Sequence, residues 1–484
     1  MTLRRTTHIV IPLILYRSRG AEISSTIKIS NARFLITLDP DRRIIQDGSL
    51  IIEGTDITHV GSSSELSGIA VDQVVDATDL VITPGFVNCH MHISYAHAVR
   101  GIYPDNIGPQ YLPTVFKLQQ DMTDEEEYYT TLLGITELIK YGTTCFLDPG
   151  TTKFLDVCME AYELTGARVI IGSNVVDKEN PLNIPVSSTE DAATEIERVI
   201  QMYDNKLNGM ITAWAMPFSP AYSSDSLLRI AKEIADKYNT GLTLHYNNSE
   251  EFINNTIAHY GKRPTEVLSD LGLLGPRTLL AHALGLHTSE LQLLRDSKTK
   301  IAICPTAAIK SGAGISHNSL VPEMLDLGIT IGLGTDAANN SNLIETMRSM
   351  YLSAVIFKDG RNDVNMVSAE TALEMATINA AHAVGLADRI GSLEVGKRAD
   401  IVMFDTMRPE WGSLFNPVNN LVYSADGRSV KMVFINGRLV VSDHTPLFID
   451  ESELIRKVQS IGENVLNRTG LHFQSKWPII KDSS

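Results

Sequence analysis

Pro84-Gly85-Phe86-Val87-Asn88-Cys89-His90-Met91-His92 is an apolar stretch that ends in two histidines separated by a single residue. The apolar run predicts a buried strand. Because side chains alternate between the two faces of a strand, His90 and His92 point to the same side and Cys89 points to the other. Two imidazoles on one face provide half of the usual ligand set of a tetrahedral metal ion. The stretch therefore predicts a metal site that later strands complete.

From residue 81 onwards, apolar runs of strand length alternate with helical patterns. Continuous apolar runs are typical of parallel strands that are buried on both faces. The clearest helical pattern, 124–141, begins with the capping box Thr123-x-x-Glu126 and ends before Gly142. Eight strands are predicted, at 81–92, 143–149, 168–176, 210–218, 241–247, 278–286, 300–307 and 329–336. These alternating units favour an α/β fold, a (β/α)8 TIM-like barrel. A doubly wound sheet is the alternative, but it would separate Asp336 from the first strand.

Short strand-like segments flank the predicted barrel on both sides. Residues 26–80 contain turn signals such as Asp47-Gly48 and show no helical period. Near the other end, Asn436-Gly437 between two apolar runs predicts a hairpin. We expect four units: a disordered N-terminal extension (1–25), a composite β-sandwich (26–80 plus 391–445), the metal-dependent barrel (81–390) and a C-terminal helix and tail (446–484).

The composition excludes several classes of partner. The chain has 484 residues and a net charge of -16, which argues against binding to nucleic acid or to anionic membranes. No run of 18 apolar residues occurs, so we expect no membrane span. The four cysteines form no C-x-x-C pair, and we expect buried free thiols and a cytoplasmic location. Arg4-Arg5 and a short apolar run follow the start, without the cleavage site of a secretory signal.

Further polar residues stand at the predicted C-terminal ends of strands, where barrel enzymes place their active sites. His245 ends the fifth strand, His282 lies in the sixth, and Asp336 ends the eighth. Each residue alone has an ordinary explanation as a core histidine or a helix cap. Together with His90 and His92 they predict a metal site. Imidazoles with one carboxylate suit a borderline dication, first Zn²⁺, with Fe²⁺, Co²⁺ or Mn²⁺ as alternatives.

Six motifs, spread over a region from about residue 27 to 442, resemble those of one family. They are Pro84-Gly-Phe-Val-Asn-Cys-His-Met-His, Tyr141-Gly-Thr-Thr, Cys304-Pro-Thr, Gly334-Thr-Asp, Ala376-Thr-Ile-Asn-Ala-Ala and Gly391-Ser-Leu-Glu-Val-Gly-Lys-Arg-Ala-Asp. The chain resembles the amidohydrolase superfamily, in the branch of the s-triazine hydrolases and heterocycle deaminases, and is most similar to the phenylurea and molinate hydrolases.

The resemblance implies a ligand set and a role for each of its members. His90, His92, His245 and Asp336 would hold one zinc-like ion, and His282 would assist catalysis. Two-metal relatives bridge their ions with a modified lysine or another carboxylate at the end of strand 4, but the stretch 210–218 contains no lysine or glutamate, which favours one metal. The resemblance also implies a homodimer or a higher homo-oligomer.

Two positions depart from the pattern of the deaminases. Deaminases carry a glutamate three residues after the strand 5 histidine, where it moves a proton to a ring nitrogen. This chain has Asn248 there, and an amide cannot exchange protons near neutral pH. Many deaminases also carry a histidine after strand 4, near the place of Phe218. Both changes weaken the deaminase interpretation, with Glu250 and Glu251 as weaker substitutes for the missing carboxylate.

Several other residues are candidates for contact with a substrate. We expect the specificity to lie in loops such as 93–121 and 308–320. Asn339, Asn340 and Asn342 follow Asp336 and are candidates to cap the next helix or to hydrogen-bond the site. The candidate substrate-binding residues are Asn248, Tyr246, Phe218, His97 and Trp214, although an aromatic residue in a strand more often belongs to the core.

We expect an enzyme that hydrolyses a C–N or C–S bond in a small molecule: a urea, carbamate, thiocarbamate or amide, with phenylurea-type compounds first. A bound metal would lower the pKa of a water molecule. Asp336 would take the proton of that water and pass it to the leaving atom, while His282 steadies the oxyanion. The alternative is a deaminase or dechlorinase of a nitrogen heterocycle (purine, pyrimidine or s-triazine). A non-catalytic relative would lack metal ligands, and none is missing.

Overall fold

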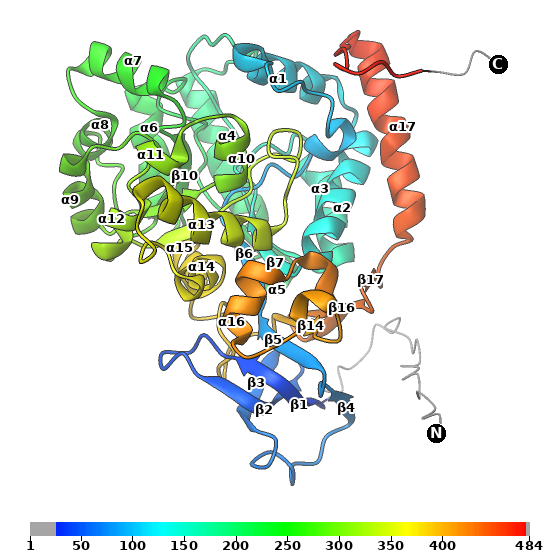
Figure 1. The fold of residues 1–484 in the computed structure, drawn as a ribbon. Helices are drawn as coiled ribbons and strands as arrows, with labels where there is room; N and C mark the ends of the chain where they lie inside the picture. The colour runs from blue at the N-terminus through cyan, green and yellow to red at the C-terminus, as the bar shows by residue number, and fades with distance from the viewer. Residues whose placement is uncertain (1–25, 481–484) are drawn as a thin grey trace.

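Eight short parallel strands form the centre of the molecule in the computed structural model, which describes residues 26–480 (Figure 1). They are β6 (Phe86–Asn88), β7 (Thr143–Leu147), β8 (Arg168–Ile171), β9 (Ile211–Ala213), β10 (Leu242–Tyr246), β11 (Thr278–His282), β12 (Lys300–Ile303) and β13 (Ile331–Leu333). They pair as two four-stranded sheets, one from β6 to β9 and one from β10 to β13. The predicted extension at 1–25 lies outside the described residues.

Hydrogen bonds beyond the strand ends join the two sheets into a closed barrel. On one side, Ala215 forms a parallel bridge with Leu242. On the other side, the backbone N–H of Cys89 donates to the carbonyl oxygen of Leu333 over 2.8 Å. The prediction of a TIM-like barrel is therefore confirmed.

Gly85 divides the first predicted strand into two strands of different sheets. β5 (Leu80–Pro84) pairs with a strand outside the barrel, and only β6 belongs to the barrel itself. A Cβ atom at Gly85 would lie 2.1 Å from Oγ1 of Thr144, so only glycine fits where the chain crosses between the sheets. β6 then leads directly to His90 and His92, which follow its last residue, Asn88.

Helices cover the barrel between its strands. As predicted, Thr123 caps α2 (Asp124–Lys140): its hydroxyl accepts from the N–H of Glu126, whose carboxylate accepts from the N–H of Thr123. The further helical patterns of the barrel and of the C-terminal region are observed as α3 (Leu155–Thr165), α4 (Thr189–Tyr203), α6 (Asp225–Lys237), α8 (Pro264–Asp270), α9 (Thr288–Ser297), α13 (Thr346–Arg361), α14 (Ala369–Ala376), α15 (Ile378–Ala383) and α17 (Glu451–Thr469). A break at Thr377, where φ is -129° and ψ is -98°, separates α14 from α15.

Additional helices occupy the connections that follow strands. They are α1 (Tyr111–Asp121), α5 (Lys206–Gly209), α7 (Glu250–Tyr260), α10 (Pro305–Lys310), α11 (Ile315–Asn318), α12 (Val321–Asp326) and α16 (Pro417–Asn419). The run 300–307 was predicted as one strand. It ends at Ile303 because Pro305, which lacks an N–H group, starts α10.

One nine-stranded sheet lies below the barrel in Figure 1 and contains strands from both ends of the chain. It consists of β1 (Thr26–Ile36), β2 (Ile44–Glu53), β3 (Asp56–Ser62), β4 (Gln73–Asp76), β5, β14 (Ile401–Asp405), β15 (Val430–Ile435), β16 (Arg438–Ser442) and β17 (Thr445–Pro446). β5 and β14 pair antiparallel, with Pro84 opposite Ile401. Asn436, with a φ of 51°, and Gly437 form the predicted hairpin between β15 and β16. The predicted domain boundaries stay a proposal.

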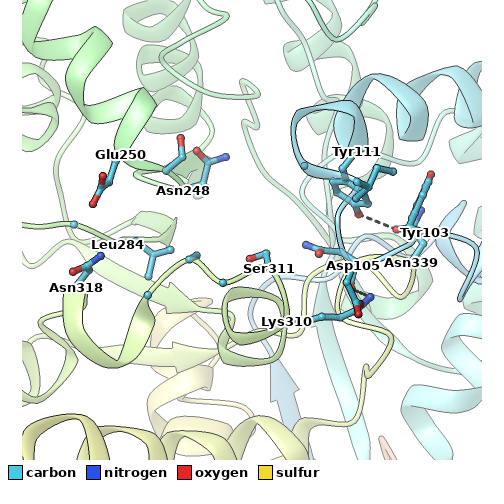
Figure 2. Close-up of a pocket in the computed structure, with 18 of the residues that line it drawn as sticks. Tyr103, Asp105, Tyr111, Asn248, Glu250, Leu284, Lys310, Ser311, Asn318 and Asn339 are labelled. Atoms are coloured by element: carbon cyan, nitrogen blue, oxygen red, sulfur yellow. Dashed lines mark hydrogen bonds between the residues drawn. The ribbon is translucent and has the colours of Figure 1, made fainter. Parts of the chain in front are cut away.

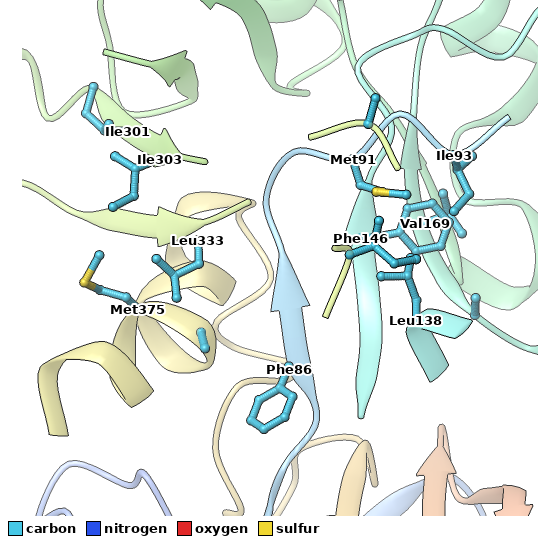
Figure 3. Close-up of a cluster of buried hydrophobic side chains, with 14 of the residues drawn as sticks. Phe86, Met91, Ile93, Leu138, Phe146, Val169, Ile301, Ile303, Leu333 and Met375 are labelled. Atoms are coloured by element: carbon cyan, nitrogen blue, oxygen red, sulfur yellow. The ribbon is translucent and has the colours of Figure 1, made fainter. Parts of the chain in front are cut away.

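Apolar packing and one buried ion pair hold the barrel together and attach it to the sheet. Figure 3 shows Phe86 between two groups of buried side chains, with Met91 and Phe146 on one side and Leu333 and Met375 on the other. Arg168 in β8 pairs with Asp400 just before β14 over 3.2 Å, and both side chains are 1% exposed. As predicted, the four cysteines are buried and free. Within residues 26–480, no helix combines the length and apolarity required to cross a bilayer.

Candidate metal centre

Four histidines and one aspartate converge at the carboxyl ends of the barrel strands. The ligand atoms of His90, His92 and Asp336 all lie within 4.8 Å of one another, and so do those of His90, His245 and His282. Nε2 of His92 lies 3.3 Å from Oδ1 of Asp336 and 3.3 Å from Nε2 of His245. The structure thus brings together all the residues predicted as ligands, and it places His282 beside them.

Hydrogen bonds on the far side of two rings determine which nitrogens face the centre. Nδ1 of His245 lies 3.0 Å from the carbonyl oxygen of Phe218, so this nitrogen carries the hydrogen. Nδ1 of His92 lies 3.2 Å from Oγ1 of Thr151, which itself donates to Asp148. In neutral rings, the two Nε2 atoms are then both bare acceptors that point at each other. Two nitrogens bound to a tetrahedral zinc ion would lie about 3.4 Å apart, so the observed spacing fits a shared cation.

His90 provides the clearest test of whether a metal fits. Its side chain is buried, and neither ring nitrogen has a hydrogen-bond partner among the described residues. Leaving buried polar atoms unpaired costs about 1–3 kcal/mol each. A divalent ion between His90, His92 and Asp336 would bind one of these two nitrogens and remove its part of the cost, so the residues present fit the metal that the sequence predicted.

The protonation states favour metal binding as well. Burial lowers the pKa of His90 well below its ordinary value, and the neighbouring histidines lower it further. Burial also lowers the pKa of His245 and of His282. Burial opposes ionisation of Asp336, but His92, His282 and His245 outweigh it and lower the pKa of the carboxyl group below its ordinary value. At neutral pH, His90, His245 and His282 are therefore neutral imidazoles and Asp336 is a carboxylate, which are the forms that bind metal.

Backbone and side-chain contacts orient Asp336 after β13. Its backbone takes a φ of 59°, a left-handed conformation that is uncommon for residues other than glycine, and its N–H donates to the carbonyl oxygen of His90 over 3.0 Å. Oδ1 accepts from the N–H of Ala337 over 2.7 Å, and Oδ2 accepts from Nδ2 of Asn340 over 3.1 Å. Asn340 is thus the asparagine after Asp336 that contacts the site.

Phe218 and Asn248 lie next to the centre and its pocket. The ring of Phe218 is centred 4.7 Å from the ring of His245 and packs edge-on against Phe116. It forms an apolar border of the metal site. Asn248 is exposed and lines the pocket described below. Both placements are compatible with contact to a substrate.

Tyr246, Trp214 and His97 lie elsewhere. Tyr246 follows His245 in β10 and therefore faces the opposite side, where its hydroxyl pairs with Thr265. Trp214 belongs to the buried apolar cluster around Val87 and Leu279, and its indole covers Gly241. His97 lies in the short helix η1 (Ala96–Val99), with Nε2 2.9 Å from Arg100 and 3.3 Å from Glu137. We therefore no longer expect these three side chains to contact a substrate.

A pocket of about 610 Å³ lies above the strand ends. Figure 2 shows Asn248 and Glu250 on one side of it and Tyr103, Tyr111 and Asn339 on the other. Asn340 connects the pocket to the metal centre, because it lines the pocket and donates to Asp336. The lining residues are Tyr103, Pro104, Asp105, Ile107, Gly108, Tyr111, Asn248, Ser249, Glu250, Ile253, Leu284, Gly285, Lys310, Ser311, Gly312, Ala313, Gly314, Asn318, Asn339 and Asn340.

Both loops in which specificity was expected, 93–121 and 308–320, contribute to this lining. The individual residues of the lining could not be predicted, because they come from loops without a periodic pattern. The sequence indicates only that Tyr103, Tyr111 and Lys310 lie in segments that follow barrel strands. No motif marks them as lining residues.

The chain is similar to known proteins over most of its length. The model of the amidohydrolase family matches residues 81–440. A 5-methylthioadenosine/S-adenosylhomocysteine deaminase of Syntrophobacter fumaroxidans is 30% identical over 433 residues, which cover 89% of this chain and 96% of that protein.

Solved structures show the same fold. An adenosine deaminase from Xanthomonas campestris with bound zinc superposes with a TM-score of 0.83 at 24% identity, covering 91% of this chain and 98% of that one. An atrazine chlorohydrolase from Arthrobacter aurescens, complexed with zinc, superposes with a TM-score of 0.82 at 22% identity, covering 90% of this chain and 100% of that one. At these identities the likeness concerns the fold.

Proposed function

This chain belongs to the amidohydrolase family, whose members hydrolyse carbon–nitrogen bonds with the help of metal, and we propose that it releases ammonia from an amino-substituted nitrogen heterocycle of the adenosine type. The buried and unpartnered imidazole of His90, facing His92 and Asp336, is the observation that supports a metal-dependent hydrolase. The relative that is 30% identical is named as a deaminase of adenosine derivatives, which supports the substrate class. The sequence alone favoured phenylurea-type compounds, and the similarity to this deaminase now places them second.

His90, His92, His245 and Asp336 are the proposed ligands of one divalent ion. Zinc is the first candidate because three imidazoles and a carboxylate suit it and because similar folds contain it. Fe²⁺, Co²⁺ and Mn²⁺ remain the alternatives. The ion would lower the pKa of a water molecule towards neutrality.

Asp336 and His282 carry the proton and charge movements in this proposal. Asp336 is ionised and buried, so it accepts the proton of the attacking water and passes it to the leaving nitrogen. The hydrogen bond from Asn340 to Oδ2 keeps the carboxylate in one orientation during the transfer. His282 is neutral because burial lowers its pKa, and its ring N–H donates to the atom on which negative charge develops.

Deamination of a heterocycle also requires a proton at a ring nitrogen. Asn248 cannot supply it, because an amide does not exchange protons near neutral pH. Glu250 and Asp105 are the two carboxylates that line the pocket. Glu250 lies two residues after Asn248 at the start of α7, and it is our candidate for this proton transfer.

Hydrolysis of a urea, carbamate, thiocarbamate or amide is the second candidate function, with phenylurea-type compounds first. The exposed amide of Asn248 in the pocket wall favours it. Such a substrate needs only one proton on its leaving atom, which Asp336 can deliver alone. The apolar border formed by Phe218 suits an aryl or alkyl group.

A metal-controlled substrate screen tests both candidates. The chain is stripped with a chelator, reloaded with Zn²⁺ and assayed with adenine nucleosides, aminotriazines, phenylureas and carbamates, following ammonia and amine release separately. We expect ammonia from an adenine nucleoside, its loss after chelation, and less than one thousandth of the activity in His90→Asn. Amine release from a urea without any ammonia would establish the second candidate instead. A chain without bound metal or turnover would refute both.

The resemblance also implies a homo-oligomer, and a cytoplasmic location was expected from the cysteines. Both stay predictions. Light scattering after size-exclusion chromatography tests the first, since the mass of one chain is 53.2 kDa.

A further inference from the structure

A buried chain of hydrogen bonds leads from His92 to a carboxylate outside the set of proposed ligands. Nδ1 of His92 lies 3.2 Å from Oγ1 of Thr151. Oγ1 of Thr151 in turn donates to Oδ1 of Asp148 over 2.9 Å. Asp148 is 1% exposed and Thr151 is 2% exposed, so water does not compete for these bonds.

The direction of this chain follows from the donors available. A hydroxyl group has one hydrogen, and that of Thr151 is used on the carboxylate of Asp148. Oγ1 of Thr151 can then only accept from His92, which places the ring hydrogen on Nδ1. Nε2 of His92 is left bare towards Asp336 and His245. Burial raises the pKa of Asp148, and the hydrogen bonds from Thr152 and Thr151 oppose that effect. The carboxyl group of Asp148 is therefore linked to the ring of His92 through one hydroxyl group.

The segment 148–152 is held firmly in this arrangement. The N–H of Thr151 also donates to Oδ1 of Asp148, over 3.1 Å, and the hydroxyl group of Thr152 donates to Oδ2. Gly150 has a φ of 82°, and a Cβ atom there would lie 2.6 Å from the backbone nitrogen of Asn174. The turn thus has little freedom to carry Thr151 away from His92.

His92 differs from the other proposed histidine ligands in this respect. His245 donates to the carbonyl oxygen of Phe218, and neither nitrogen of His90 has a partner among the described residues. A carboxylate behind a ligand histidine fixes the tautomer and orientation of the ring and raises its basicity. Among these three histidines, only His92 is linked to a carboxylate that is not itself a proposed ligand. Its affinity for a cation therefore depends on residues outside the ligand set.

We propose that Thr151 is a positioning residue that couples the carboxylate of Asp148 to His92 and thereby sets the affinity of the centre for its divalent ion. The inference rests on the metal site of the proposed function. It adds that two residues which touch neither metal nor substrate determine how tightly the metal is held.

The test is the affinity for Zn²⁺ of the full chain, measured by competition with a chromogenic chelator. Thr151→Val keeps the shape of the side chain and removes the hydroxyl group, and we expect about 10- to 100-fold weaker binding. Thr151→Ser restores the hydroxyl group and should bind within about threefold of the wild type. Thr136→Val is the matched control, because Thr136 is equally buried but bonds only to the carbonyl oxygen of Leu132 within α2.

Asp148→Asn provides a second variant that keeps the size of the side chain and removes its charge. We expect it to weaken zinc binding as Thr151→Val does, in protein whose circular dichroism matches the wild type. Zinc affinity in both variants equal to that of the wild type would overturn the proposal. A wild-type chain that binds no zinc would instead refute the metal site itself. Because the wild type is measured first, this outcome is distinguished from a failure of the proposal about Thr151.

Discussion

Asn248 and Glu250 together determine whether the pocket can transfer a proton to a bound heterocycle. Asn248 lies three residues after His245, and its amide cannot transfer a proton near neutral pH. Glu250 lies two residues further on, in the first turn of α7. Both line the same cavity. If Glu250 takes over the proton transfer, the function of the site depends on a residue displaced by two positions along the chain.

Glu250→Gln is therefore expected to lower ammonia release from an adenine nucleoside by about 100-fold, since loss of a general acid or base costs about 10²–10⁴ in rate. Adding Asn248→Glu to this variant should recover much of the rate, because it places a carboxylate in the pocket lining again. The measurement is kcat for ammonia release. Glu251→Gln, the neighbouring residue outside the lining, serves as the control. Full activity of Glu250→Gln would show that the proton comes from elsewhere.

Glu137 is a buried carboxylate outside the metal site that should make stability depend on pH. Burial opposes its ionisation, but His97 and Arg100 outweigh this effect and lower its pKa from 4.5 to about 2. Burial also lowers the pKa of His97, so at neutral pH the positive charge beside Glu137 comes from Arg100 at 2.6 Å. Because the folded pKa is depressed, the stabilisation is present above about pH 4.5 and is lost as the pH falls towards 2.

Glu137→Gln should accordingly reduce the free energy of unfolding at pH 7 by on the order of 2 kcal/mol. In urea titrations from pH 7 to pH 3, the difference between the wild type and the variant should shrink. Glu125→Gln removes an exposed pair with Lys457 and should change stability little at either pH. A difference that stays constant across this range would contradict the assignment to Glu137.

The residues of the metal centre were predictable, whereas part of the pocket was not. His90, His92, His245, His282 and Asp336 stand at strand ends, and barrel topology brings such ends together. Strand alternation could have excluded Tyr246, since it adjoins His245. The place of His97 could not be predicted, because it depends on a short helix and on partners in α2.

At the scale of elements, the least predictable features were the places where one element becomes another. Gly85 separates β5 from β6, and Pro305 turns the end of β12 into α10. Both runs are mostly apolar on the two sides of the break, so hydrophobicity alone predicts one continuous strand. The helix at 124–141 was predicted to within one residue, as α2 shows, whereas several barrel strands were predicted too long: the run 210–218 is a strand only at Ile211–Ala213.

The pair between Arg168 and Asp400 joins β8 of the barrel to the start of β14 in the sheet. Asp400 also accepts from the backbone N–H of Asn436 at 2.8 Å, so one carboxylate contacts both β8 and the hairpin between β15 and β16. A buried charge whose partner is removed costs several kcal/mol. Loss of this ion pair should therefore destabilise both the barrel and the nine-stranded sheet.

Asp400→Asn is expected to destabilise the chain by about 3–5 kcal/mol, because it leaves the guanidinium group of Arg168 buried without a counter-charge. Asp56→Asn removes an ion pair with Arg398 whose side chains are 32% and 45% exposed, and it should cost less than about 1 kcal/mol. Chemical denaturation of both variants checks this. Equal stabilities would mean that Arg168 finds another partner.

Across the whole molecule, the segment after α17 packs against a residue that lines the pocket. The ring of Phe473 packs edge-on against Tyr103 at 5.3 Å, and Tyr103 packs edge-on against Tyr111 at 5.2 Å. The hydroxyl group of Tyr111 donates to Oδ1 of Asn339 over 3.0 Å. Phe473, which follows α17, thus supports one wall of the pocket through Tyr103 and Tyr111.

Phe473→Ala should raise KM by about 3- to 10-fold while changing kcat little, because an aromatic contact of about 0.5–1.5 kcal/mol is lost from the wall and not from the metal centre. Phe415→Ala is the matched control, since Phe415 is 90% exposed and lies outside the lining. Steady-state kinetics with any substrate found in the screen will check this. A KM equal to that of the control would show that the tail does not support the wall.

The pairing of β5 with β14 has a consequence for the timing of folding during synthesis. Pro84 pairs with Ile401, so the strand leading into the first two proposed ligands stays without one neighbour until more than 300 further residues have been made. At about 5–20 residues per second, this interval lasts roughly 15–60 s. Throughout it, the nascent chain exposes an apolar strand edge that can pair with another chain. We therefore expect ribosome-bound chains that stop before residue 400 to require a chaperone, and chains released with β14 complete to leave it.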